Sequence, residues 1–202
     1  YNEEFEKEFG DIKIENGTIT EIGIINDDGV DMSGSIILPG FVDIHIHGGN
    51  GADCSDGTAD SFEKISTYLA SKGFTSFCAT TMTLPHKKLK AIAEVANSFN
   101  SPKSKLVGIN LEGPYIANAK AGAQNREYIR NASVDEVNEL LDICNKIKLI
   151  TIAPEVSDTS EFITQLKQKM TISIGHSCAN EKEARESIDK GIAHATHLFN
   201  AM

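Results

Sequence analysis

The sequence predicts an α/β protein built from repeated βα units around a parallel sheet. From Leu38 onward, short apolar segments alternate with stretches of helical periodicity, which is the pattern that such units produce. Six such units suit either a doubly wound sheet or most of a (β/α)8 barrel, and both folds place their chemistry at the carboxyl ends of the strands. The strands are expected at 40–46, 74–80, 106–112, 148–154, 171–176 and 192–198.

Amphipathic segments fill the intervals between these strands. Ser133, with Glu136 three residues later, is a helix-start signal of the capping-box type. The helices are expected at 59–72, 86–99, 133–146, 159–169 and 180–190.

The first part of the chain follows a different pattern. Residues 11–25 alternate apolar and polar side chains around Asn16 and Gly17. This dipeptide supplies the positive φ angles of a type I′ turn, which predicts a β-hairpin. We therefore expect a small β domain at 1–37 and the βα units at 38–202.

The composition narrows the range of partners. The formal net charge is -10, so the overall field repels nucleic acid and anionic membranes. No apolar run approaches the roughly 20 residues of a bilayer span. The acidic N-terminus has neither a signal-peptide core nor an initiator Met, so we expect the chain to begin inside a longer gene product. The four cysteines form no Cys-x-x-Cys pair, which fits a cytoplasmic protein better than a disulfide framework.

Five potential metal ligands lie at the ends of the expected strands. His45 and His47 are two residues apart and therefore project to the same face of the first strand. The others end the third, fifth and sixth strands of the βα region, and they are Glu112, His176 and His197. Since the carboxyl ends of parallel strands meet at one rim, we expect these side chains to converge. Imidazoles with a carboxylate suit Zn²⁺, Fe²⁺, Mn²⁺ or Co²⁺, whereas Ca²⁺ and Mg²⁺ prefer oxygen ligands throughout.

The other residues that could take part in chemistry are interpreted as structural. His86 follows Pro85 at an expected helix start and is interpreted as a surface residue, while His194 should point away from His197. "GGNG" at 48–51 lacks the Gly-Lys-Ser/Thr ending of a phosphate loop, so its glycines are interpreted as allowing close backbone approach. Ser177 and Cys178 beside His176 have no nucleophile elbow around them, which makes a covalent mechanism the weaker hypothesis.

Several motifs resemble the amidohydrolase superfamily and, within it, the N-acetylglucosamine-6-phosphate deacetylases. They are "LPGFVDIHIHGGNGAD", "LEGPYI", "TIAPE", "IGHS" and "ATHLFNAM", in that order along nearly the whole chain. The resemblance implies a (β/α)8 barrel, with residues 1–37 as part of a small β-sandwich domain. It also implies deacetylation of an amino sugar phosphate by one or two divalent ions, with Zn²⁺ or Fe²⁺ expected foremost. It further implies a small-molecule substrate and a homodimer.

The resemblance also assigns individual residues. It implies metal ligation by Glu112, His176 and His197, while His45 and His47 match family members that hold a second metal. Asn200 and Ala201 would hold the phosphate of the sugar; the alternative for Asn200 is a helix cap. Ala123 and Gln124 match the substrate loop of the family, in which many members have His in place of Gln124.

The sequence stops at Met202, before the Asp that the family uses as general acid and base and before the last two barrel strands. The chain is therefore expected to be incomplete, and inactive as it stands. Two alternatives remain open: another amidohydrolase, such as a cyclic amidase or a nucleobase deaminase, and a non-catalytic incomplete barrel that binds metal or sugar phosphate.

Overall fold

The structure is a computed structural model that describes residues 4, 6–26 and 28–201. The chain divides into two compact units, Tyr1–Pro39 and Gly40–Met202.

The first unit contains the expected hairpin. Strands β1 (Asp11–Glu15) and β2 (Thr18–Gly23) pair antiparallel. Between them, Asn16 and Gly17 have φ angles of 52° and 77°, as a type I′ turn requires. The prediction of a hairpin is confirmed, whereas the assignment of residues 1–37 to a β-sandwich stays a prediction.

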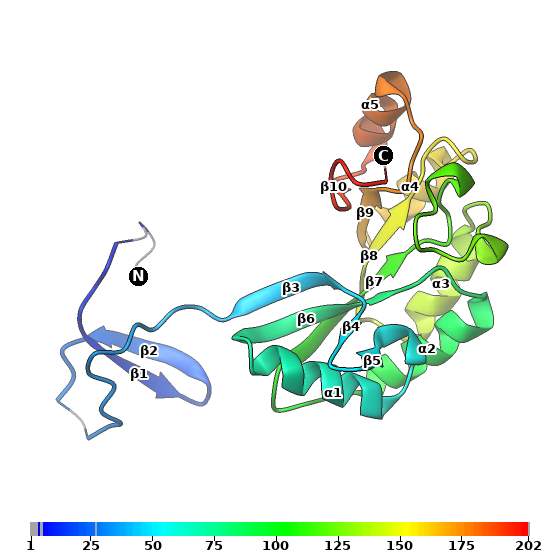
Figure 1. The fold of residues 1–202 in the computed structure, drawn as a ribbon. Helices are drawn as coiled ribbons and strands as arrows, with labels where there is room; N and C mark the ends of the chain where they lie inside the picture. Colours follow the sequence, from blue (N-terminus) through cyan, green and yellow to red (C-terminus); the bar gives the residue numbers. More distant parts are fainter. Residues whose placement is uncertain (1–3, 5, 27, 202) are drawn as a thin grey trace. The chain divides into compact units, whose positions relative to one another are not determined.

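The second unit is built on one six-stranded sheet in which all strands run parallel (Figure 1). Its spatial order is β10-β9-β8-β7-β6-β3, so each strand lies beside its neighbour along the chain apart from the short β4 and β5. A doubly wound sheet would reverse its order at a switch point. The unbroken order therefore identifies part of a (β/α)8 barrel. The strands are β3 (Phe41–Ile46), β6 (Phe74–Thr81), β7 (Lys105–Glu112), β8 (Ile147–Ile152), β9 (Thr171–Ile174) and β10 (His194–Ala195).

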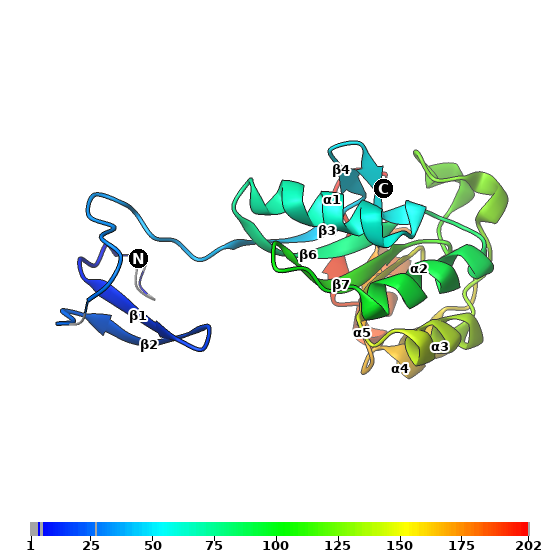
Figure 2. The ribbon, with the colours of Figure 1, turned by 90° about the horizontal axis from the view of Figure 1, so that it is seen from below.

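Five α-helices connect these strands within the part of the chain that the structure describes. Right-handed crossovers between consecutive strands bring successive helices to the same face of a sheet, and α1 and α2 lie side by side over β6 and β7 (Figure 2). The helices are α1 (Ala59–Ala70), α2 (His86–Ser98), α3 (Val134–Ile143), α4 (Ser160–Leu166) and α5 (Glu181–Lys190). None of these helices has the length and apolar character needed to cross a membrane.

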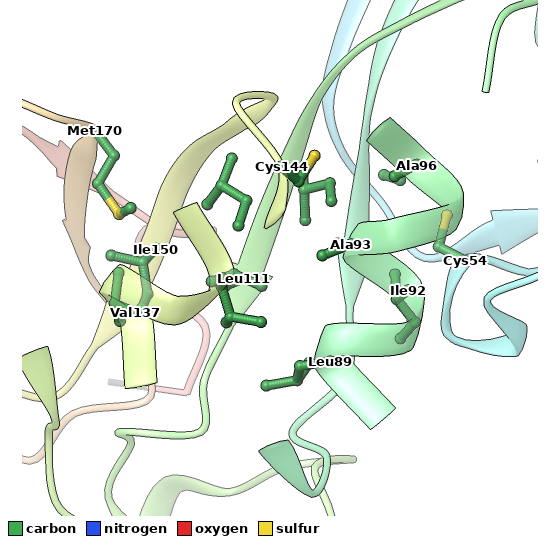
Figure 3. Packing of buried hydrophobic residues seen from close by; sticks show 14 of the residues in the cluster. Cys54, Leu89, Ile92, Ala93, Ala96, Leu111, Val137, Cys144, Ile150 and Met170 are labelled. Atoms are coloured by element: carbon green, nitrogen blue, oxygen red, sulfur yellow. The ribbon is translucent and has the colours of Figure 1, made fainter. Parts of the chain in front are cut away.

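The hydrophobic core fills the space between the helices and the sheet. Figure 3 shows Ile92 and Ala93 of α2 and Val137 of α3 in one cluster with Leu111 of β7 and Ile150 of β8, all of them buried. Because side chains alternate along a strand, the residues on either side of Leu111 point to the opposite face. Glu112 is one of those residues, so the packing that buries Leu111 also directs this carboxylate away from the helices.

Several elements are shorter than the sequence predicts. Strand β9 ends at Ile174 and β10 contains only two residues, because the backbone turns into the left-handed region at His176 and His197, with φ of 49° and 31°. Helix α3 ends at Ile143 since Cys144 is extended. At the start of α3, the Ser133 hydroxyl accepts a hydrogen bond from the Glu136 amide, as the expected capping box requires. The Glu136 carboxylate does not complete the box, because it accepts from the Arg130 guanidinium at 2.9 Å.

Candidate metal centre

Glu112 lies at the centre of the predicted ligand group. It ends β7 and is only 2% exposed. Burying an ionised carboxylate is costly unless several donors or a cation compensate it. The surroundings of Glu112 therefore decide what the site can do.

The pair His45 and His47 approaches Glu112 from the end of β3. The Nε2 atom of His45 lies 3.3 Å from Oε1 of Glu112, and that of His47 lies 2.8 Å from Oε2. The Asp43 carboxylate accepts from the His45 backbone amide at 2.9 Å. The two-residue period thus places both imidazoles where the sequence predicts.

A second pair reaches the same carboxylate from β9 and β10. Nε2 of His176 lies 3.1 Å and Nε2 of His197 lies 2.9 Å from Oε1 of Glu112. These two nitrogens are 3.2 Å from each other. The four predicted histidines therefore meet around the fifth predicted ligand, Glu112. Its Oε1 atom lies near His45, His176 and His197, and its Oε2 atom lies near His47.

Backbone carbonyl oxygens beside Nδ1 of His176 and His197 fix the tautomer that metal ligation requires. Nδ1 of His176 lies 2.7 Å from the Lys120 carbonyl oxygen, and Nδ1 of His197 lies 3.0 Å from that of Asn200. A carbonyl oxygen can only accept, so Nδ1 carries the proton in each neutral ring. The Nε2 lone pair is then free to ligate a cation.

The pKa shifts in the group reflect mutual stabilisation of opposite charges. Burial would raise the pKa of Glu112, but hydrogen bonds from His176, His45 and His47 outweigh it and hold this pKa well below its ordinary value. Burial would likewise lower the pKa values of His47 and His176, but the hydrogen bond to ionised Glu112 raises both above 6.5. A cation could take over the role of the protons on these rings.

The donor set fits a divalent transition metal. One potential ligand atom from each of His45, His47 and Glu112 lies within 4.8 Å of the others, and the same holds for Glu112, His176 and His197. Three nitrogen and oxygen ligands with positions left open are typical of catalytic zinc sites. Nearby Cys54 is a poor competitor, because burial raises the pKa of its thiol to about 12.

The glycines after His47 form a tight hairpin of β4 (Gly48–Gly49) and β5 (Ala52–Asp53). A Cβ atom on Gly48 would lie 2.2 Å from the Ala52 carbonyl oxygen, so the close approach of the two strands excludes a side chain there. This agrees with the sequence-based interpretation of "GGNG".

The predicted substrate residues lie on two segments. Gln124 is 6% exposed and its amide donates to Glu112 Oε2 at 2.7 Å, while Ala123 is exposed. Asn200 donates its backbone amide to the His197 carbonyl, and the Ala201 carbonyl accepts from the Ser177 amide at 3.3 Å. Contacts of these four residues with substrate stay predictions. The helix-cap alternative for Asn200 likewise stays a prediction.

The histidines left out of the metal set have protein partners. Nδ1 of His194 lies 2.9 Å from the Ser173 hydroxyl, and Nε2 of His86 lies 3.1 Å from a Glu139 carboxylate oxygen. His86 is partly rather than fully exposed, because it contacts Glu139 of α3.

The sequence-based reasoning missed Glu155. Its carboxylate accepts from the Ser177 hydroxyl at 2.7 Å and from the Cys178 backbone amide at 2.6 Å. These contacts fix the loop directly after His176 and leave the Ser177 hydroxyl engaged. A carboxylate just beyond the end of β8, in "TIAPE", was the signal that could have identified it.

Comparison with protein families supports this interpretation of the fold. Residues 36–202 match the amidohydrolase family. The chain therefore belongs to the amidohydrolase family.

The chain is similar in sequence to proteins described as N-acetylglucosamine-6-phosphate deacetylases. The chain is 37% identical over 176 residues to the N-acetylglucosamine-6-phosphate deacetylase of Bacillus subtilis (strain 168), covering 83% of this chain and 44% of that protein. The Homo sapiens protein of the same description is 33% identical over 187 residues, covering 88% and 46%. The chain thus spans about half the length of the curated relatives it matches.

Solved structures of deacetylases with this description have a similar fold. The N-acetylglucosamine-6-phosphate deacetylase of Pasteurella multocida superposes with a TM-score of 0.85 at 30% identity, covering 94% of this chain and 52% of that one. A variant of the Mycobacterium smegmatis deacetylase, in complex with N-acetyl-D-glucosamine-6-phosphate, gives a TM-score of 0.83 at 28% identity, covering 95% and 51%.

Proposed function

We propose that the protein containing this chain hydrolyses the acetamide of N-acetylglucosamine 6-phosphate to acetate and glucosamine 6-phosphate. The observation that carries the proposal is the convergence of four imidazole Nε2 atoms on the buried Glu112 carboxylate. Relatives described as deacetylases of this sugar phosphate support the choice of substrate.

The ligands have distinct tasks in this proposal. Glu112, His176 and His197 would hold one divalent ion, and His45 and His47 would share Glu112 with a second. When bound, such an ion supplies Lewis-acid chemistry, lowering the pKa of water and polarising a carbonyl oxygen. Zn²⁺ and Fe²⁺ are the ions we propose first. The Lys120 and Asn200 carbonyls keep Nδ1 of His176 and His197 protonated, so each ring presents its lone pair inward.

Substrate binding and proton transfer would use further groups. Asn200 and Ala201 would bind the phosphate, and Ala123 and Gln124 would lie near the sugar. An Asp beyond residue 202 would accept the proton of the attacking water and deliver it to the leaving amine. No side chain of the site needs to act as a nucleophile, which agrees with the engagement of Ser177 by Glu155.

The test uses the complete gene product. Turnover of N-acetylglucosamine 6-phosphate should fall by about 100-fold or more after chelation, since a Lewis acid is worth several kcal/mol, and Zn²⁺ should restore it. His197→Ala should resist this restoration, whereas the matched His86→Ala, on the surface contact with Glu139, should respond like the wild type.

Three outcomes separate the alternatives. Unchanged turnover in the metal-free protein would defeat the mechanism. Equal turnover of unphosphorylated N-acetylglucosamine would defeat the phosphate assignment and favour another amidohydrolase. Metal binding without turnover of either sugar would favour a non-catalytic barrel.

A further inference from the structure

The loop at 117–124 contacts two of the proposed ligands, His176 and Glu112. The Ala117 backbone amide donates to the His176 carbonyl oxygen at 2.9 Å. The Lys120 carbonyl accepts from Nδ1 of His176, and the Gln124 side chain reaches Glu112. The loop thus lies directly behind two of the proposed ligands.

The Gln124 amide is held at both of its ends. Its Oε1 atom accepts from the Thr83 backbone amide at 2.6 Å, and its Nε2 atom donates to Oε2 of Glu112 at 2.7 Å. The Thr83 hydroxyl in turn donates to the Glu112 carbonyl oxygen at 3.2 Å. Gln124, Thr83 and Glu112 therefore close a ring of hydrogen bonds around the end of β7.

This ring determines which way the amide faces. A backbone N–H can only donate and an ionised carboxylate can only accept, so a flipped amide would place donor against donor and acceptor against acceptor. The Gln124 and Glu112 side chains are both buried, at 6% and 2% exposed, and leaving buried polar groups unpaired is costly. The NH₂ group is therefore fixed toward Glu112.

The contact distinguishes the two carboxylate oxygens. Oε1 of Glu112 faces Nε2 of His176 and His197, whereas Oε2 faces Nε2 of His47. Gln124 donates to Oε2 only. Oε1 also lies 3.3 Å from Nε2 of His45, so one carboxylate faces both histidine pairs, and the Gln124 contact holds it in that rotation. Because the amide is neutral and has no titratable proton, it adds no competing charge.

We propose that Gln124 is a positioning residue that fixes the Glu112 carboxylate as the ligand shared between the two histidine pairs. This inference rests on the proposed metal centre. It gives the glutamine a role that does not require contact with substrate.

The test measures metal binding by the complete gene product rather than turnover. Gln124→Met keeps the side-chain length and removes both hydrogen bonds, and Gln124→Asn keeps the amide but is one methylene too short to reach both partners. Loss of such outer contacts weakens metal binding by about 10- to 100-fold, measured by Zn²⁺ titration against a chelator. The visible spectrum of the Co²⁺-substituted variants should also change, because the spectrum reports ligand geometry.

Gln165→Met is the matched control, since Gln165 also donates to a carboxylate, Glu161, at 2.7 Å but on the exposed surface of α4. It should keep wild-type affinity and spectrum. Thermal unfolding of the metal-free proteins identifies which Gln124 variant folds, and metal binding is compared with the wild type in that variant. Wild-type affinity and spectrum in a folded Gln124 variant would overturn the inference alone. A wild-type protein that binds neither ion would overturn the metal centre, and this inference with it.

Discussion

At the residue scale, the site depends on one buried carboxylate that is the common neighbour of four imidazoles. Glu112 is held ionised by its hydrogen-bond donors, and in return it raises the pKa values of His47 and His176. Below these raised pKa values, protons occupy the Nε2 atoms of His47 and His176, which a metal would also use. Metal and protons compete for the same atoms.

This competition predicts the pH dependence of metal binding. The pKa values of His47 and His176 are raised, so below those values each ring carries a second proton and is positively charged. The Nε2 proton must leave before that nitrogen can ligate a metal. Zn²⁺ uptake should release more protons, and be weaker, at about pH 6 than at about pH 8.5. Calorimetric titration in two buffers with different ionisation enthalpies measures the number released. Equal affinity and no proton release at the lower pH would contradict the account.

The convergence of the candidate ligands could be predicted from the sequence, but their supporting contacts could not. The position of His45, His47 and Glu112 at strand ends follows from the period-two alternation of strands and from the polarity of parallel sheets. The roles of Gln124 and Lys120 depend on how a loop without regular periodicity folds back over the rim. No spacing in the sequence encodes the direction of an amide.

At the element scale, the loop after β9 presents His176 to Glu112. His176 adopts a φ of 49°, a conformation that costs a non-glycine residue of order 1 kcal/mol or more and persists only where surrounding contacts impose it. The Glu155 carboxylate supplies two of these contacts, to the Ser177 hydroxyl and the Cys178 amide. Glu155 therefore stabilises the backbone that presents His176.

Replacing Glu155 tests this support. Glu155→Ala removes two hydrogen bonds to a charged acceptor and should lower the free energy of unfolding by about 1–3 kcal/mol, with weaker metal binding. Urea denaturation measures the first effect. Glu94→Ala, on the exposed face of α2, is the control and should change stability by no more than about 0.5 kcal/mol. Equal stability of the two variants would refute the role of Glu155.

The type of each element was predictable, because strands and helices differ in the spacing of their apolar residues. The residues at which the elements end were harder to predict. The expected strand at 192–198 is reduced to His194–Ala195, because His197 leaves the extended region and turns its Nε2 atom toward Glu112. The turn that brings His197 to Glu112 thus ends the strand before its apolar pattern does.

At the scale of the whole molecule, the strand order decides between the two folds that the sequence left open. Both folds use right-handed βα units, so local periodicity cannot separate them. The monotonic order from β3 to β10 places every strand end of the group on one continuous rim. That continuity brings Glu112 and the residues of β3, β9 and β10 together.

The sheet of the described residues has two free edges, β3 and β10. Phe41, Val42 and Ile44 of β3 are each more than 40% exposed, an unusual amount for apolar residues of one strand. A closed eight-stranded barrel would place two more strands between these edges. We expect the general acid-base Asp of the proposed mechanism to lie on the rim of those two strands.

We propose that Glu112, His176 and His197 hold a divalent ion in the complete protein, and the mechanism depends on this ion. Anomalous diffraction at the zinc absorption edge, from crystals of the Zn²⁺-loaded gene product, tests it most directly. We predict a peak about 2.0–2.2 Å from a Glu112 carboxylate oxygen and from Nε2 of both His176 and His197. A loaded protein with its only peak elsewhere, or with these three side chains too far apart to share an ion, would contradict the account.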